Sequence, residues 1–177
     1  MNYSIYLREL YLSDAKISFN WRNNPIIWKY TGFKPDKIIT EKIELEWLRN
    51  ALKKPNDHRF AICLKKNSQY IGNVQLTNVQ SNTAEFHLFI GDPSFWGMGI
   101  GKQATSLMLN FGFTYLELHS INLEVHKENY AAKALYKKIG FSENGMNNDF
   151  LKMILHKDQV SAFQDKTIPT QFPSVPQ

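Results

Sequence analysis

The chain has 177 residues, of which 43% are hydrophobic and 21% are charged, and its formal net charge is +5. This length favours a single domain with a core of its own, and the composition excludes disordered and collagen-like proteins. No apolar run reaches the roughly 18 residues of a membrane span, no signal-peptide pattern is evident at the start, and Cys63 is the only cysteine. We therefore expect a cytoplasmic protein with no membrane partner, and the excess of Lys and Arg favours an anionic ligand.

The front of the sequence predicts one strand and two main helices. Alternating polar and apolar residues predict a strand over Ile5–Leu10. Asp14 is placed to cap a helix over 15–23, and Thr40 is placed to cap a helix over about 41–53. The apolar stripe predicted for the second helix consists of Ile43, Trp47, Leu48 and Ala51.

The middle of the sequence predicts an antiparallel meander. Three strand-like runs cover 58–64, 70–79 and 83–91. The polar linkers between them, 66–69 and 80–82, are short enough for hairpins.

The pattern after Gly91 changes to alternating helices and strands. Five apolar residues at helical spacing predict a helix with one buried face: Ala104, Leu107, Met108, Phe111 and Tyr115. A strand over 120–126 follows, and then a helix that begins at Asn129 and ends at Gly140.

A hairpin is predicted to close the domain. Its strands are expected over 141–144 and 150–156, around a turn at Asn144-Gly145. We therefore predict one domain over residues 1–157 and a proline-containing tail over 158–177.

A glycine-rich segment over 96–102, WGMGIGK, lies between a predicted strand and a predicted helix. Its backbone N–H groups, together with the N-terminus of the helix, predict a cradle for a pyrophosphate. It is not a P-loop, because Gly97 and Gly101 enclose three residues instead of four, and it is not a dinucleotide fingerprint, because Lys102 stands where that fingerprint has a glycine. A turn that serves only packing is the alternative.

A second segment, NYAAKALYKKIGF over 129–141, follows one helix and one strand later. The two segments, in this order and spacing, resemble the GNAT superfamily of acetyl-CoA-dependent N-acetyltransferases. The resemblance extends from about Tyr3 to His156. It implies an α/β fold with a mixed, largely antiparallel sheet, flanked by helices and splayed between its fourth and fifth strands, with acetyl-CoA in the gap.

The resemblance also implies contacts with the cofactor. These fall on the fourth strand (Leu88, Phe89 and Ile90), on the loop amides (Met98, Gly99, Ile100, Gly101 and Lys102) and on Asn129. Trp96 departs from the family, which usually has Arg or Gln at this position. Because the loop acts through its backbone, we still expect acetyl-CoA to bind.

Tyr136 matches the tyrosine that protonates the leaving thiolate in this family. An amine acceptor is protonated at neutral pH, so a base or a water chain must remove a proton. Glu85 is the first candidate for this base, and His87, on the same face of the strand, is its rival. A core tyrosine and solvated strand residues are the alternatives. A backbone amide of the fourth strand is expected to stabilise the oxyanion.

The acceptor wall is expected at the front of the chain. This region carries Trp21, Arg22, Trp28, Tyr30, Phe33 and Trp47, and the third strand adds Asn73, Gln75 and Thr77 on one face. Aromatic rings can stack on a base or sugar, and Arg22 can pair with a phosphate or carboxylate. For Trp47, a packing role is preferred. The Trp-Arg-Asn segment resembles the acetyltransferases of nucleotide-linked 4-amino sugars of the pseudaminic-acid type and, more loosely, those of ribosomal-protein N-termini.

We therefore predict an N-acetyltransferase that moves an acetyl group directly, in a ternary complex, to a small-molecule amine on a nucleotide-linked amino sugar. A protein N-terminal acetyltransferase and a non-catalytic acetyl-CoA-binding module are the alternatives. The five histidines lack metal-ligand spacing and the basic residues are scattered, so neither a metal nor a nucleic acid is expected. The oligomeric state stays open, with a homodimer among the options.

Overall fold

The computed structural model describes residues 3–31 and 34–160. Phe33 and the tail after Val160 therefore lie outside the described residues. Within them, seven strands form one sheet in the order β1-β2-β3-β4-β5-β7-β6. The strands are β1 (Ile5–Glu9), β2 (His58–Leu64), β3 (Tyr70–Gln80), β4 (Thr83–Ile90), β5 (Ser120–His126), β6 (Ser142–Asn147) and β7 (Phe150–His156). The helices are α1 (Ala15–Arg22), α2 (Pro25–Trp28), α3 (Glu41–Ala51), α4 (Ile100–Asn110) and α5 (Tyr130–Ile139).

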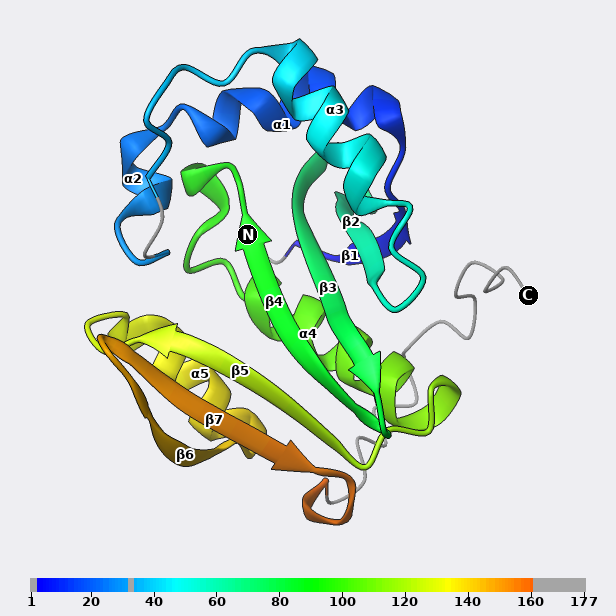
Figure 1. Cartoon of the computed structure of the whole chain (residues 1–177), viewed down its shortest axis with the longest axis vertical. Coiled ribbons are helices and arrows are strands. Elements are labelled where there is room, and N and C mark those ends of the chain that lie inside the picture. Colours follow the sequence, from blue (N-terminus) through cyan, green and yellow to red (C-terminus); the bar gives the residue numbers. More distant parts are fainter. Residues whose placement is uncertain (1–2, 32–33, 161–177) are drawn as a thin grey trace.

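The sheet consists of a first arm, formed by β1–β4, and a second arm, formed by β5–β7, which separate between β4 and β5 (Figure 1). This pair is parallel and holds through three residue pairs, Thr83–Ser120, Ala84–Ile121 and Glu85–Asn122. The other neighbouring strands pair antiparallel. The structure thereby confirms the predicted α/β fold with a mixed, largely antiparallel sheet splayed between its fourth and fifth strands.

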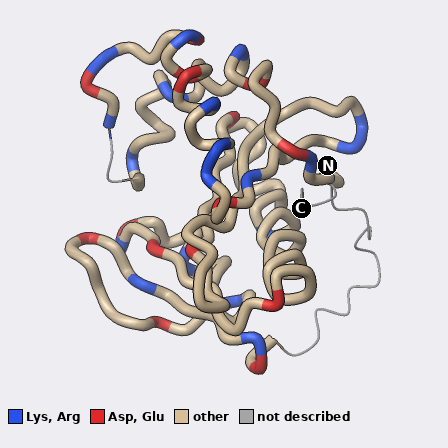
Figure 2. The backbone as a smooth tube through the Cα atoms, turned by 45° about the vertical axis from the view of Figure 1, so that its right-hand side comes forward, with Lys and Arg blue, Asp and Glu red and all other residues tan. Residues whose placement is uncertain are grey.

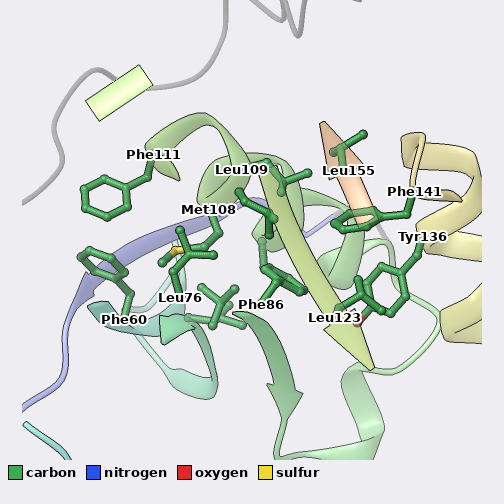
Figure 3. Packing of buried hydrophobic residues seen from close by; sticks show 14 of the residues in the cluster. Phe60, Leu76, Phe86, Met108, Leu109, Phe111, Leu123, Tyr136, Phe141 and Leu155 are labelled. Carbon is green, nitrogen blue, oxygen red and sulfur yellow. The ribbon is translucent and has the colours of Figure 1, made fainter. Parts of the chain in front are cut away.

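Helices cover both faces of the sheet. The larger core lies on the side of α4 and α5, where side chains such as Phe86, Met108 and Leu123 pack together (Figure 3). A second core lies between α1, α3 and the opposite face of the first arm, and it contains Trp21 and Leu48. Lys and Arg are interspersed with Asp and Glu on both arms (Figure 2). No helix among the described residues is both long and apolar enough to cross a membrane.

Two predictions for the front helices need correction. Asp14 does not cap α1, because its carboxylate instead accepts hydrogen bonds from the Arg8 guanidinium and the Tyr11 N–H. Trp47 is not part of the buried stripe of α3, whose buried positions include Glu44. Thr40 caps α3 as predicted, since its Oγ1 accepts the N–H of Ile43.

Two predictions for the second half are also wrong in detail. A π-helical turn over Phe111–Tyr115 continues α4 and leaves Tyr115 exposed, because its wider spacing rotates this residue off the buried stripe. The closing hairpin turns at Asn148-Asp149, while Asn144-Gly145 lie inside β6 at a bulge in the pairing with β7.

Candidate active site

The edge of β4 that faces β5 is open beyond Glu85, where the described strands diverge. At the end of this edge, the N–H of Gly91 donates to the carbonyl of Ile71 on β3. In a planar trans peptide the adjoining carbonyl, that of Ile90, points the opposite way, into the opening. Two residues earlier the same alternation directs the N–H and C=O of Leu88 into the opening. An extended ligand could therefore pair with β4 as an added strand would.

The loop before α4 presents backbone N–H groups close to this edge. Gly97 and Gly99 have φ of +73° and +77°, a region that favours glycine. The N–H of Gln103 donates to the carbonyl of Gly99, so the N–H groups of residues 100–102 point out of the first turn of α4. A Cβ on Gly101 would lie 3.4 Å from the Leu135 side chain and 3.5 Å from the Leu88 side chain, so the first turn of α4 lies close to both β4 and α5. This arrangement fits the pyrophosphate of a CoA molecule.

Trp96 covers the end of the open edge. Its indole Nε1–H donates to the Ile90 carbonyl at 3.0 Å, and the residue is 42% exposed. The tryptophan that departs from the family pattern is therefore hydrogen-bonded to the strand that would contact a cofactor.

Asn129 and Tyr136 lie at the start and in the middle of α5. Asn129 caps this helix, because its side-chain oxygen accepts the N–H of Ala132 at 3.2 Å. The ring of Tyr136 packs edge-on against Phe86 and Phe141, beside Leu123 (Figure 3). It thus lies where β4 and β5 begin to separate. Burial raises the pKa of Tyr136, so the phenol stays protonated at neutral pH.

Glu85 and His87 lie together on the other face of β4, and both are half exposed. The His87 Nε2 is 3.8 Å from a Glu85 carboxylate oxygen and 3.0 Å from the Thr77 hydroxyl. Desolvation lowers the pKa of His87, against the opposing charge of Glu85, and the positive charge of Arg59 adds to the lowering. His87 is therefore neutral at physiological pH and can accept a proton.

The predicted acceptor residues divide into packing and accessible groups. Trp21 is 8% exposed, and its ring packs on Tyr70 and Phe89 and occupies the space that a Cβ on Gly91 would need. Trp21 is therefore a core residue here. The Trp28 indole N–H donates to the Arg22 carbonyl at 2.7 Å.

Two of the predicted polar side chains have partners of their own. The Asn73 side-chain oxygen accepts the Tyr70 hydroxyl, and the Gln75 side-chain oxygen accepts Arg59. Lys102 and Met98, at the start of α4 and in its loop, are exposed.

We call the face of β2, β3 and β4 that carries Glu85 and His87 the acceptor face. Beside it lie three residues that the sequence analysis did not identify as part of the site: Glu44, Trp47 and Arg59. Glu44 is 3% exposed and accepts hydrogen bonds from Ser18 and Arg22. One signal could have found it, because a carboxylate one turn before Leu48 falls on the buried stripe of the helix.

Comparisons with known proteins agree with this geometry. Residues 4–142 match the profile of the acetyltransferase (GNAT) domain. The chain is 33% identical over 147 residues to a spermidine N(1)-acetyltransferase of Vibrio cholerae, covering 82% of this chain and 83% of the relative. It is 26% identical over 155 residues to the acetyltransferase PseH of Campylobacter jejuni, covering 87% and 93%.

Among the solved structures that resemble this chain is a spermidine N-acetyltransferase, and the likeness covers nearly the whole of that enzyme. The spermidine N-acetyltransferase from Vibrio cholerae, in complex with CoA and spermine, superposes with a TM-score of 0.78 at 27% identity, covering 88% of this chain and 97% of that chain. The profile match spans well over half of the sequence. The chain therefore belongs to the GNAT family of acetyltransferases and is an acyltransferase.

Proposed function

We propose that the protein transfers the acetyl group of acetyl-CoA directly to the primary amine of a nucleotide-linked amino sugar. Acetyl-CoA, when bound, supplies an acetyl group activated as a thioester. The observation that carries the proposal is the convergence at the open edge of β4. The Leu88 N–H points into the opening, Tyr136 lies on one side of it, and Glu85 with His87 lies on the other.

Each of these groups has one task in the transfer. His87 accepts the proton of the acceptor amine, and the Glu85 carboxylate stabilises the resulting imidazolium. The Leu88 N–H donates to the thioester oxygen as negative charge develops there. Tyr136 donates its proton to the departing sulfur. We thus infer that His87 is the base and that Glu85, the first candidate from the sequence, assists it.

The cofactor is proposed to lie along β4 and against the start of α4. Leu88 and Ile90 offer backbone groups to the pantetheine arm, and residues 98–102 offer their N–H groups to the pyrophosphate. Asn129 keeps its side-chain NH2 for the cofactor while its oxygen caps α5.

A polyamine is the second candidate acceptor, because two relatives are named spermidine acetyltransferases. Such a ligand is a cation and needs carboxylates beside it. At the acceptor face, Glu44 and Asp57 already pair with Arg22 and Arg59. The terminal N–H groups of Arg22, which Glu44 does not occupy, favour an acceptor that carries an anionic part.

The experiment is a measurement of CoA thiol release from acetyl-CoA with a panel of amines. The panel contains UDP- and dTDP-linked 4-amino sugars, spermidine, spermine, peptides with free Ala or Ser N-termini, and an aminoglycoside. Turnover confined to a nucleotide sugar supports the proposal. Turnover on spermidine or on peptides replaces the acceptor class and keeps the acetyltransferase, whereas no turnover on any member contradicts the proposal.

A further inference from the structure

Two arginine side chains lie close to the Trp47 ring at the acceptor face. The guanidinium carbon of Arg22 is 4.2 Å from the centre of the indole, and that of Arg59 is 5.8 Å from it. These residues come from α1, α3 and β2, so the fold brings together three distant parts of the sequence. Trp47 is 39% exposed, so part of its side chain is accessible to a ligand.

The Arg22 side chain is held in place on this surface. Its Nε donates to Glu44, which is buried and also accepts the Ser18 hydroxyl. Among the described residues, none accepts a hydrogen bond from its two terminal nitrogens, and the side chain is 25% exposed. A guanidinium with a fixed plane and unused terminal N–H groups is suited to bind an oxyanion through two parallel hydrogen bonds.

The Arg59 side chain is buried to nine-tenths. Its terminal nitrogens donate to Asp57 and Gln75. Its Nε is buried and has no partner among the described residues. Because this Nε is sealed from solvent and both terminal nitrogens are occupied, Arg59 contributes its charge and its contact with Trp47 to the cluster, whereas the free N–H donors are those of Arg22.

The cluster lies at a defined distance from the point of transfer. Arg59 pairs with Gln75 in the sheet, and Gln75 pairs with His87, so the three residues cross β2, β3 and β4 at one level. Two strand spacings separate Arg59 from His87, which is about 10 Å. The carboxylate of Glu85 lies at the transfer end of this row, and the arginines lie at the other end.

We propose that Arg22, Trp47 and Arg59 form a subsite for an anionic oxygen group of the acceptor, two strands away from His87, the proposed base. The proposal rests on the proposed function and assigns a place in the site to the phosphoryl groups of its acceptor. Each arginine already has a carboxylate partner, so the subsite holds the anion through N–H donors and the indole surface rather than through a net positive charge.

The test is calorimetric binding of UDP, inorganic pyrophosphate, succinate and spermidine to the full chain in saturating CoA, so that the α4 loop is occupied. We expect UDP or pyrophosphate to bind, and Arg22→Gln to weaken this binding by about 10-fold or more. Trp47→Leu should weaken UDP more than pyrophosphate, since only UDP has a ring. Arg49 is an exposed arginine on α3, the helix that carries Trp47. Arg49→Gln is therefore the control for loss of an arginine and should leave binding unchanged.

Folding is controlled with a second variant. Arg22→Gln leaves Glu44 buried without its cation, whereas the double variant Arg22→Gln with Glu44→Gln removes both charges; thermal melting compares the two. Binding of succinate instead of pyrophosphate assigns the anion as a carboxylate. Binding of spermidine alone, or an Arg22→Gln variant that binds anions like wild type, overturns the subsite. Anion binding without acetyl transfer to any nucleotide sugar would instead contradict the proposed function and leave the subsite standing.

Discussion

The Tyr136 hydroxyl is the group in this site whose chemistry depends most directly on burial. Surrounding aromatic rings keep the phenol protonated, so it can donate to a departing sulfur but cannot act as a base. We expect Tyr136→Phe to lower kcat by about 100-fold, with the affinity for acetyl-CoA and the melting temperature nearly unchanged. Steady-state kinetics with CoA binding measure both quantities. An unaltered kcat would remove Tyr136 from the mechanism.

His87 and Glu85 can be separated by the pH dependence of the rate. Since desolvation lowers the pKa of His87, its protonation should reduce kcat/KM only as the pH falls below about 6.5, the ordinary histidine value. The charge of Glu85 raises the pKa of His87, so Glu85→Gln should move this acid limb to lower pH and retain activity. His87→Gln should abolish the limb together with most of the rate. If Glu85→Gln is the inactive variant, Glu85 is the base.

Trp96 provides a test of cofactor placement along β4. Its indole N–H occupies the Ile90 carbonyl that points into the opening, where the pantetheine arm is proposed to pair. Trp96→Phe keeps a ring and releases that carbonyl, so we expect CoA to bind about 2- to 10-fold more tightly, the worth of one hydrogen bond. Isothermal titration of CoA checks this. Weaker binding would mean that the indole supports the cofactor instead of competing with it.

The place of a single residue was predictable where a sequence motif contains it, and it was not predictable where it depends on contacts between residues that are distant in the sequence. The segment over 129–141 predicted that Asn129 begins α5, which the structure confirms, whereas the roles of Asn129 and Tyr136 toward acetyl-CoA stay predictions. In contrast, Trp47 gained its environment from Arg22 and Arg59, which lie on other elements. Helical periodicity could only place Trp47 on the apolar stripe of its own helix. A contact between distant residues leaves no local trace in one sequence.

At the scale of elements, the start of α4 is the part of the site whose backbone matters most. Gly99 has positive φ and open space where a side chain would begin, which is where the pyrophosphate is proposed to lie. Gly99→Val should abolish CoA binding and should destabilise the fold by about 1–2 kcal/mol through backbone strain. Gly145→Val is the matched control, because Gly145 also has positive φ and open space but lies in β6. If both variants bind CoA alike, the loop is not the cradle.

The elements themselves were largely predictable, and the exceptions have physical reasons. Periodicity and caps located α3 and α5, because each helix buries one face against the sheet, and strand-like runs with short polar linkers located the meander. The π-helical turn after α4 broke the regular spacing on which the prediction for Tyr115 depended. Asn144-Gly145, a typical hairpin turn pair, instead forms a bulge, because the pairing of β6 with β7 places the turn four residues later.

At the scale of the whole molecule, the opening between the two arms is bounded by elements that no local pattern relates. The splay followed from the family resemblance, and the order of β2, β3 and β4 followed from the predicted meander. The contact that crosses the opening did not: the Tyr30 ring, just after α2, lies 5.6 Å from the His126 ring at the end of β5, and His126 packs on Phe150 of β7. The segment that follows α2 is thereby in contact with the second arm.

This cross-arm contact should set how firmly the acceptor is enclosed. Tyr30→Ala removes one aromatic pair, so we expect the acceptor KM to rise by about 2- to 10-fold while kcat and CoA affinity stay close to wild type. Tyr115→Ala removes a comparable stacking contact with Phe111, away from the opening, and should leave the acceptor KM unchanged. Equal effects of the two variants on KM would show that general stability, and not the link between the arms, governs acceptor binding.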